Sequence, residues 1–335
     1  MKALVVGGGS IGRRHLKNLR ALGLDKLGIV ETNPDRRTAV ASEVNAVPFS
    51  GLDAGLEWSP DFVVVATPTY LHLHHALSAA QRGCDLFVEK PLSHTSEGLL
   101  ELSELAERKN LISLVGCNMR FHPGPAKVKE LLEEGALGKV FFARVHCGSY
   151  LPGWRPGSDY RENYAAREES GGGCILDCIH EIDLARWYLG DVQDVLCMTA
   201  HTGSLEIETE DVAALVCRHS NGAMSEIHLD YVQRSYERGC QIVGERGSLF
   251  WDFASGQVRW FDAGGAQWTV FSQPETWHVN EMYVSEMKHF LECVQSRCVT
   301  TLPIPEAVSV MQIAFAAKTS AREGRLATID KEVPA

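Results

Sequence analysis

Short apolar runs alternate with longer amphipathic stretches over about the first 118 residues of the chain. The runs are uninterrupted, which is typical of strands buried on both faces of a parallel sheet. The stretches between them are long enough for helices, so we expect right-handed crossovers and a doubly wound α/β sheet. The predicted strands are residues 3–6, 27–30, 62–66, 85–88 and 111–115, and the predicted helices are 10–22, 70–82 and 96–109.

The pattern changes near residue 119. Beyond it most predicted strands alternate apolar and polar side chains, as strands with one wetted face do, and short connections favour antiparallel pairing. The predicted strands are residues 140–148, 195–201, 212–218, 223–231, 240–243, 248–252 and 268–271, and the predicted helices are 127–134, 174–188 and two more after residues 280 and 305. We therefore expect an α/β domain over residues 1–119 and an α+β domain over residues 120–335.

Composition limits the classes of protein to consider. A length of 335 residues suggests about two domains, and 45% hydrophobic with 22% charged residues is typical of a soluble globular protein. A formal net charge of −11 argues against a nucleic-acid or anionic-membrane surface, because either needs basic patches. The first strand begins at residue 3, and no apolar run approaches the roughly 18 residues of a membrane span. We expect a cytoplasmic protein.

The ten cysteines are scattered through apolar segments. In a reducing compartment such cysteines act as small hydrophobic side chains. Cys174, Cys178 and His180 resemble a zinc cluster, but the sequence has no C-x-x-C pair elsewhere to complete it. We expect no metal site.

A glycine-rich turn, residues 7–12, follows the first predicted strand and fits G-x-G-x-x-G. Its first glycine permits a tight turn, its second leaves the backbone open to a pyrophosphate, and its third lets the next helix lie close to the strand. That helix points free N–H groups at the phosphate. The turn predicts a Rossmann-type dinucleotide site, although glycines also occur in purely structural turns. Its predicted cofactor contacts are Gly7, Gly9, Ser10, Ile11 and Gly12.

The second predicted strand ends at Glu31, nineteen residues after Gly12. A carboxylate there can accept hydrogen bonds from both ribose hydroxyls of an adenosine and would repel a 2′-phosphate, which favours NAD. Arg36 and Arg37 follow closely and leave NADP open. They also suit the solvated first turn of a helix that Pro34 begins.

Two further strand ends carry unusual chemistry, and ligands of such sheets lie beyond the carboxyl ends of the strands. One strand runs into Thr67, Pro68 and His72, and the next runs into Glu89 and Lys90, followed by a proline. We expect these residues to contact the cofactor, with the Lys90 ammonium aimed to where a nicotinamide would lie. A surface salt bridge between Lys90 and Glu89 is the alternative.

A predicted helix after residue 173 carries Asp177, His180 and Asp183 at every third position, so neighbours in this series share one face. A carboxylate beside an imidazole fixes its tautomer and tunes its pKa, which suits general acid and base catalysis. The alternative is a helix whose His and Asp side chains satisfy one another beneath the second sheet.

The long loop over residues 151–171 is unusual in a compact domain and suits either a binding loop or a surface or subunit contact. Arginines in a binding pocket would fit an anionic substrate, while ordinary surface pairing explains each of them singly. The candidate substrate contacts from this loop and elsewhere are Arg120, Trp154, Arg155, Tyr160, Tyr164, Tyr231 and Arg234.

Together these motifs resemble the glucose-fructose oxidoreductase / inositol dehydrogenase / rhizopine catabolism family of NAD(P)-dependent oxidoreductases. The resemblance covers nearly the whole chain. Its elements are the glycine turn, Ala66-Thr67-Pro68 with His72, Glu89-Lys90-Pro91, Asn118-Met119-Arg120-Phe121, and the glycine-rich approach to Asp177 and His180.

The resemblance implies a Rossmann domain followed by an α+β domain with a large, mostly antiparallel open sheet. It also implies that Lys90 and His180 flank the reacting carbon and that Asp177 supports them. The family usually places four steps between this Asp and His, whereas this chain has three, so Asp183 is a reserve candidate for the supporting carboxylate.

The resemblance further implies hydride transfer to or from a sugar, a cyclitol or a sugar derivative, including nucleotide-linked ones, and a homodimer or homotetramer formed through the second sheet. Two alternatives remain. One is a non-catalytic regulator that senses NAD(P), and the other is an enzyme that keeps its cofactor bound and oxidises one sugar while reducing another.

Overall fold

The computed structural model describes residues 1–155 and 157–329. It contains two compact units. Unit 1 comprises Met1–Asn118 and His278–Val308, and unit 2 comprises Met119–Trp277 and the chain from Ser309 onward. The sequence pattern placed residues 278–308 in the second domain, and the structure differs because α9 (Asn280–Ser296) packs on α1 (Ser10–Ala21) of unit 1. Its Phe290 is fully buried against the rings of Phe62 and Phe87.

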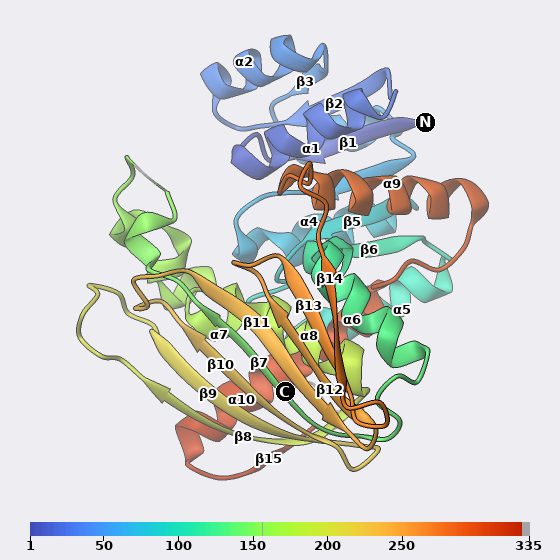
Figure 1. The fold of residues 1–335 in the computed structure, drawn as a ribbon. Helices are drawn as coiled ribbons and strands as arrows, with labels where there is room; N and C mark the ends of the chain where they lie inside the picture. Colours follow the sequence, from blue (N-terminus) through green and yellow to red (C-terminus); the bar gives the residue numbers. More distant parts are fainter. Residues whose placement is uncertain (156, 330–335) are drawn as a thin grey trace. The chain divides into compact units, whose positions relative to one another are not determined.

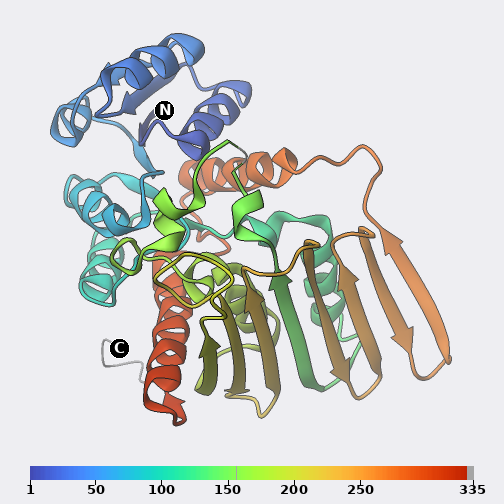
Figure 2. The ribbon, with the colours of Figure 1, turned by 90° about the vertical axis from the view of Figure 1, so that its left-hand side faces the viewer.

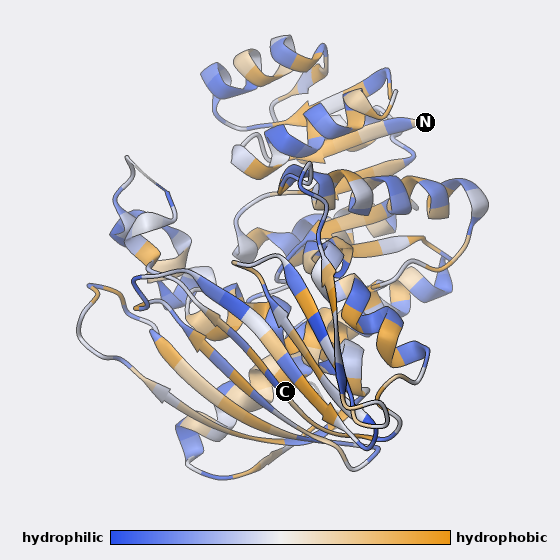
Figure 3. Ribbon diagram, in the orientation of Figure 1, coloured by the Kyte–Doolittle hydropathy of each residue, from blue (hydrophilic) through white to orange (hydrophobic). Residues whose placement is uncertain are grey.

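Unit 1 is built on a six-stranded parallel sheet, sheet A, in the order β3-β2-β1-β4-β5-β6. This is the strand order of a doubly wound dinucleotide-binding fold, which confirms the prediction. Its apolar strands appear in orange in Figure 3. The strands are β1 (Lys2–Val6), β2 (Lys26–Val30), β3 (Val47–Phe49), β4 (Phe62–Val65), β5 (Asp85–Glu89) and β6 (Ser113–Gly116). The other helices of this part are α2 (Pro34–Val44), α3 (Leu52–Glu57), α4 (His72–Gln81) and α5 (Leu99–Arg108).

Unit 2 is built on a nine-stranded sheet, sheet B, in the order β14-β13-β12-β11-β7-β10-β9-β8-β15. All neighbours pair antiparallel except β10 and β7. Figures 1 and 2 show the strands side by side as an open sheet. The strands are β7 (Val140–Gly148), β8 (Val192–Ala200), β9 (Val212–His219), β10 (Met224–Asp230), β11 (Glu237–Gly244), β12 (Gly247–Asp252), β13 (Gln257–Asp262), β14 (Gln267–Ser272) and β15 (Ala327–Thr328).

Helices cover one face of sheet B and leave the other open. The short α7 (Cys174–Asp177) and α8 (Ile179–Leu189) pack on the central strands, and α6 (Pro123–Glu133) packs on β12 and β13. The long α10 (Ile304–Glu323) is joined to β8 by a hydrogen bond from the Cys197 N–H to Ser320 Oγ. The period-two alternation of β8 to β10 follows from this one-sided covering.

The open face of sheet B carries many apolar side chains. Met198 is 76% exposed, and Leu196, Val216 and Met224 are exposed on the same or neighbouring strands. At the other end of the sheet, Trp268 stacks obliquely on Phe250 and Phe261 from the adjoining strands. Such an accumulation of apolar side chains is more than scattered surface residues explain.

Several elements were missed or misplaced from the sequence. The short edge strand β3, which contains a proline, was not predicted, nor were β13 and α3. The prediction of one continuous helix over residues 174–188 is wrong, because the chain leaves helical geometry at Cys178 (φ −91°, ψ 35°) and forms two helices. Among residues 1–155 and 157–329, none of the helices combines the length and apolarity needed to traverse a membrane.

Candidate active site

The glycine turn lies between the ends of β1 and β4. Gly7 has φ 103°, and a side chain there would lie 2.5 Å from the carbonyl oxygen of Ala66. At Gly12 a side chain would fall on the carbonyl oxygen of Gly7, so the third glycine is required for packing α1 against the turn. A side chain on Gly9 would meet no atom within 4 Å. This open position beside uncapped N–H groups of α1 fits a pyrophosphate.

Glu31 lies at the end of β2, beside the glycine turn. Its Oε2 accepts a hydrogen bond from the Gly8 N–H (2.9 Å), and its Oε1 accepts one from the Asn33 N–H (2.9 Å). The guanidinium of Arg36 lies 3.4 Å from Oε2. Burial raises the pKa of the Glu31 carboxyl, but the two backbone N–H groups and Arg36 outweigh it and hold the pKa below its usual value. Glu31 is thus ionised beside the turn, as a ribose-binding carboxylate must be.

His72 contacts the segments that follow β4 and β5, the two other strand ends at which the sequence predicted cofactor contacts. It is buried, with Nδ1 2.8 Å from the carbonyl oxygen of Pro91 and Nε2 2.7 Å from that of Thr67. Burial is the main cause of its lowered pKa. His72 therefore positions the backbone of the Thr67-Pro68 and Lys90-Pro91 segments, and its ring nitrogens face these carbonyl groups.

Glu89 and Lys90 lie at the end of β5, next to α1. The Glu89 carboxylate is 2.6 Å from Nε2 of His15, a fully buried α1 residue that sequence reasoning missed. Its second oxygen accepts a hydrogen bond from the Lys90 N–H at 3.3 Å. Glu89 thus fixes the backbone that carries Lys90. The only sequence signal for His15 was its position, because it is a polar side chain on the apolar face of the predicted helix and therefore needs a buried partner.

In unit 2, Asp177 is held by two tyrosines. Its Oδ1 accepts a hydrogen bond from the Tyr164 hydroxyl (3.0 Å), and its Oδ2 accepts one from the Tyr231 hydroxyl (3.2 Å). Asp177 and Tyr231 are buried. Two predicted substrate contacts from distant segments thus converge on one predicted catalytic carboxylate.

Asp183 has a different partner. Both of its oxygens bond the guanidinium of Arg120, at 2.8 and 2.6 Å, and both side chains are buried. Because the chain breaks helical geometry at Cys178, the expectation that Asp177 and His180 share one helix face is wrong, whereas His180 and Asp183 both lie on α8, three residues apart. His180 is buried in the first turn of α8, and Lys90 belongs to unit 1.

The remaining predicted substrate contacts fall into two places. Trp154 packs edge-on against Tyr231 with ring centroids 5.4 Å apart, and the guanidinium of Arg155 lies over the ring of Tyr164. Tyr160 instead accepts a hydrogen bond from the Glu206 N–H at 3.2 Å. Arg234 lies 3.7 Å over the ring of Tyr150, an aromatic residue not singled out from the sequence.

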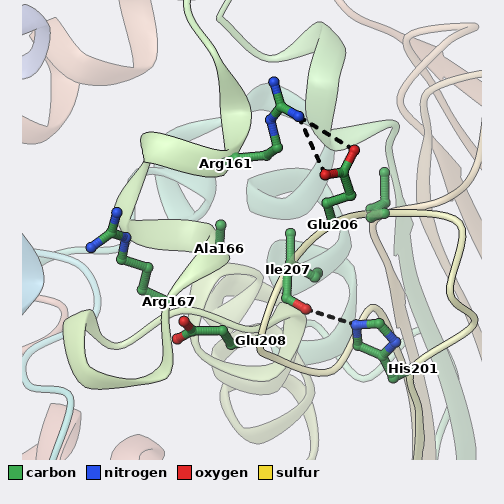
Figure 4. A pocket seen from close by; sticks show the side chains of 8 residues that line it. Arg161, Ala166, Arg167, His201, Glu206, Ile207 and Glu208 are labelled. Carbon is green, nitrogen blue, oxygen red and sulfur yellow. Dashed lines mark hydrogen bonds and ion pairs between the residues drawn. The ribbon is translucent and has the colours of Figure 1, made fainter.

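A separate cavity of about 440 Å³ in unit 2 is lined by residues that include Arg161, His201 and Glu206 (Figure 4). The guanidinium of Arg161 turns to Glu206, and His201 binds the carbonyl oxygen of Ile207. None of the predicted catalytic residues lines this cavity. Within the described part of the chain, no three His, Cys, Asp or Glu side chains are grouped so as to hold a metal ion.

Comparison with known proteins identifies the family. Residues 1–117 match the model of the "Oxidoreductase family, NAD-binding Rossmann fold", and residues 126–250 match that of the "GFO/IDH/MocA C-terminal domain". A relative named inositol 2-dehydrogenase 2 from Saccharopolyspora erythraea is 30% identical over 262 residues, which cover 73% of this chain and 71% of that protein. The chain belongs to the GFO/IDH/MocA oxidoreductase family.

Two further similarities extend over nearly the whole chain. The scyllo-inositol 2-dehydrogenase (NAD(+)) of Bacillus subtilis is 25% identical over 98% of this chain and 96% of its own length. A solved structure of levoglucosan dehydrogenase in complex with NADH has a TM-score of 0.88 at 20% identity and covers 98% of this chain and 99% of that one, which shows the shared fold.

The residues of unit 1 fit the NAD that this oxidoreductase family binds. The open backbone at Gly9 suits the pyrophosphate, and the ionised Glu31 suits the adenosine ribose. Figure 1 shows both strands that end at these residues, β1 and β2, side by side in blue. The protein is accordingly an NAD-dependent oxidoreductase.

Proposed function

We propose that this enzyme transfers a hydride between NAD and the secondary carbinol or ketone carbon of a sugar, a cyclitol or a derivative of either. The observation that carries this proposal is that the phosphate-binding glycine turn and Lys90 follow neighbouring parts of sheet A. Gly7 contacts the end of β4, and Lys90 follows the adjacent β5. Relatives named for inositol oxidation support the substrate class.

The bound NAD would supply the hydride acceptor at its nicotinamide carbon. Lys90 would hydrogen-bond the substrate oxygen and stabilise the negative charge that develops on it during oxidation. This role requires an ammonium fixed in advance, and Glu89 fixes the backbone on which it stands.

His180 would take the hydroxyl proton during oxidation and return it during reduction. Asp177 would support His180 electrostatically. Its two hydrogen bonds from Tyr164 and Tyr231 fix the orientation of the carboxyl group. Asp183 is less suited to this role because the Arg120 guanidinium neutralises its charge, whereas the two tyrosine partners of Asp177 donate from uncharged hydroxyl groups.

The substrate would lie among the aromatic and cationic side chains gathered around Asp177. Trp154, Tyr164 and Arg155 supply flat apolar surface and a cation, a combination suited to sugar rings and to acidic or nucleotide-linked sugars. Arg120 already forms a buried ion pair with Asp183 through Nε and Nη2, which neutralises its charge and makes it a weaker candidate for an anionic substrate.

A panel of free sugars, inositols, sugar acids and nucleotide sugars, each incubated with NAD and followed by absorbance of reduced nicotinamide, tests the proposal. We expect turnover with at least one member and loss of that turnover in His180→Asn. If NAD binds but no member is oxidised in either direction, the NAD-sensing alternative replaces this proposal. Retention of the nucleotide on gel filtration, with turnover only when two sugars are present, would identify the sugar–sugar oxidoreductase.

We also infer a homodimer or homotetramer formed through the open face of sheet B. The exposed apolar side chains Leu196, Met198 and Val216 support it, because burying them against a second copy would remove them from water.

A cytoplasmic location is also part of the proposal. It is supported by the ten cysteines, all of which are free thiols.

A further inference from the structure

Two cysteines meet at the C-terminal end of α9 in unit 1. Cys293 lies in the last turn of the helix and Cys298 just beyond it, with their Sγ atoms 3.1 Å apart. A disulfide has an S–S distance of about 2.05 Å, so the two sulfur atoms need to approach by about 1 Å. The backbone already holds these residues together, since the Cys298 N–H donates to the carbonyl oxygen of Cys293 at 3.2 Å.

The two thiols differ in exposure and acidity. Cys293 is 2% exposed, and burial is the main cause that raises its pKa to about 12. Cys298 is exposed, and hydrogen bonding with Ser296, whose Oγ lies 3.3 Å away, and then with Cys293 lowers its pKa. An accessible sulfur of lowered pKa beside a second thiol is the usual arrangement of an attacking and a resolving cysteine.

The turn between them is anchored to sheet A. Arg297 has φ 56°, a left-handed conformation that a non-glycine residue rarely adopts. Its guanidinium binds Asp85 Oδ2 (2.5 Å) and the Asn110 carbonyl oxygen (2.6 Å). Because these two bonds to sheet A hold the backbone of the turn, the sulfur atoms can approach each other by side-chain rotation alone, without rearrangement of the helix.

We propose that Cys293 and Cys298 are a site of reversible oxidation to a disulfide by hydrogen peroxide. The Cys298 thiolate attacks one peroxide oxygen, which forms a sulfenic acid and releases hydroxide. The Cys293 sulfur then attacks the Cys298 sulfur, the S–S bond forms and water leaves. In total two thiols lose two electrons and two protons, and one peroxide becomes two waters. A dithiol reductant reverses the reaction by thiol–disulfide exchange.

The site is selective within this chain. The other eight cysteines are buried, and burial raises the pKa of several of them, including Cys84 and Cys240. Burial therefore limits the access of peroxide to all eight.

The test uses the reduced full-length protein, treated with an equimolar amount of hydrogen peroxide and examined by intact mass and peptide mapping. We expect the loss of two hydrogen atoms per chain, a cross-linked peptide pair containing Cys293 and Cys298, and full recovery with dithiothreitol. Cys298→Ser should abolish the mass loss, whereas the matched control Cys84→Ser, which removes a buried thiol of the same unit, should retain it.

In Cys293→Ser the sulfenic acid at Cys298 should persist and be trapped by dimedone. Since Cys298 is exposed, Cys298→Ser folds regardless of how Cys293→Ser behaves, and it alone decides the outcome. The alternative is that the two thiols only pack against each other as an apolar contact at the end of the helix. Peroxide would then add oxygen to Cys298 without forming a cross-link. That result, or a mass loss that survives in Cys298→Ser, would overturn the proposal.

Discussion

We expect the replacement of Lys90 to affect the rate of hydride transfer more than any other single substitution. Lys90→Met keeps the length of the side chain and removes the ammonium, so we expect turnover to fall roughly a hundredfold to a thousandfold, as for loss of a donor to a developing oxyanion. NAD affinity should change little, because the phosphate cradle is built from the glycine turn. Steady-state rates and NAD titration by fluorescence measure the two effects. Lys109→Met, an exposed lysine of the same unit, is the control, and equal turnover in both variants would reject the role.

We expect Glu31 to decide which dinucleotide binds. Replacing it with Ser removes a carboxylate that would accept hydrogen bonds from ribose, and charged hydrogen bonds contribute about 1.5–3 kcal/mol each. We expect NAD affinity to fall about tenfold to a hundredfold, while NADP affinity rises because Arg36 loses its carboxylate partner and Arg37 stays close by, bonded to the backbone carbonyl oxygen of residue 31.

Calorimetric titration of both nucleotides checks this prediction. Asp35→Ser, which removes an exposed carboxylate at the start of α2, is the matched control and should leave both affinities unchanged. An unaltered NAD affinity in Glu31→Ser would show that this carboxylate does not hold the ribose.

The same carboxylate predicts a pH dependence of stability. Because the folded-state pKa of Glu31 is lowered, its contribution is fully present above the unfolded value of about 4.3 and is lost as the pH falls through the folded value. Melting temperatures measured across this acidic window should decline more steeply in the wild type than in Glu31→Gln. Parallel curves for the two proteins would contradict the assignment.

At the scale of elements, substitutions at two glycines of the same turn should affect NAD binding and protein stability separately. Gly9→Ala places a methyl group where no atom lies within 4 Å, so the melting temperature should stay near that of the wild type while NAD binding weakens at least tenfold. Gly12→Ala forces a methyl group onto the Gly7 carbonyl, and overpacking of this kind typically costs about 1–3 kcal/mol. Thermal unfolding and NAD titration of both variants test the pair, and an unchanged melting temperature in Gly12→Ala would be evidence against the close packing of α1.

Sequence patterns predicted the elements that are buried and regular. The uninterrupted apolar runs of β1, β4 and β5 have few alternatives, and the G-x-G-x-x-G turn fixed where α1 begins. The break at Cys178 was not predictable, because residues 174–188 keep an apolar helical stripe across it. The tyrosines that hold Asp177 come from positions 13 and 54 residues away, and no local pattern contains that information.

For the whole molecule, the open face of sheet B predicts assembly. Met198→Glu together with Val216→Glu should place charges in the interface and reduce the molar mass observed by light scattering, since buried unpaired charges are costly. Val299→Glu, at a residue as exposed as Met198 but in unit 1, should leave the mass unchanged. If the double variant and the wild type have the same mass, assembly does not use this face.

The whole-molecule organisation was predicted only in part. The change from uninterrupted to alternating strands near residue 119 marks the junction between the two sheets, but α9 lies far along the chain and packs on unit 1. Its amphipathic pattern predicts a helix and does not say which sheet the apolar face meets. Long-range partners of this kind depend on complementary surfaces such as that of Phe290 with Phe62 and Phe87.

The central claim, hydride transfer from a carbinol carbon to NAD, is tested most directly by isotope transfer. The enzyme is incubated with NAD and inositols or sugars carrying deuterium on their ring carbons, and the nicotinamide product is examined by mass spectrometry. We predict one deuterium gained per nicotinamide reduced with at least one substrate, and labelling of the nicotinamide at least a hundredfold slower with Lys90→Met. NAD that binds stoichiometrically yet remains unlabelled with every substrate would contradict the account.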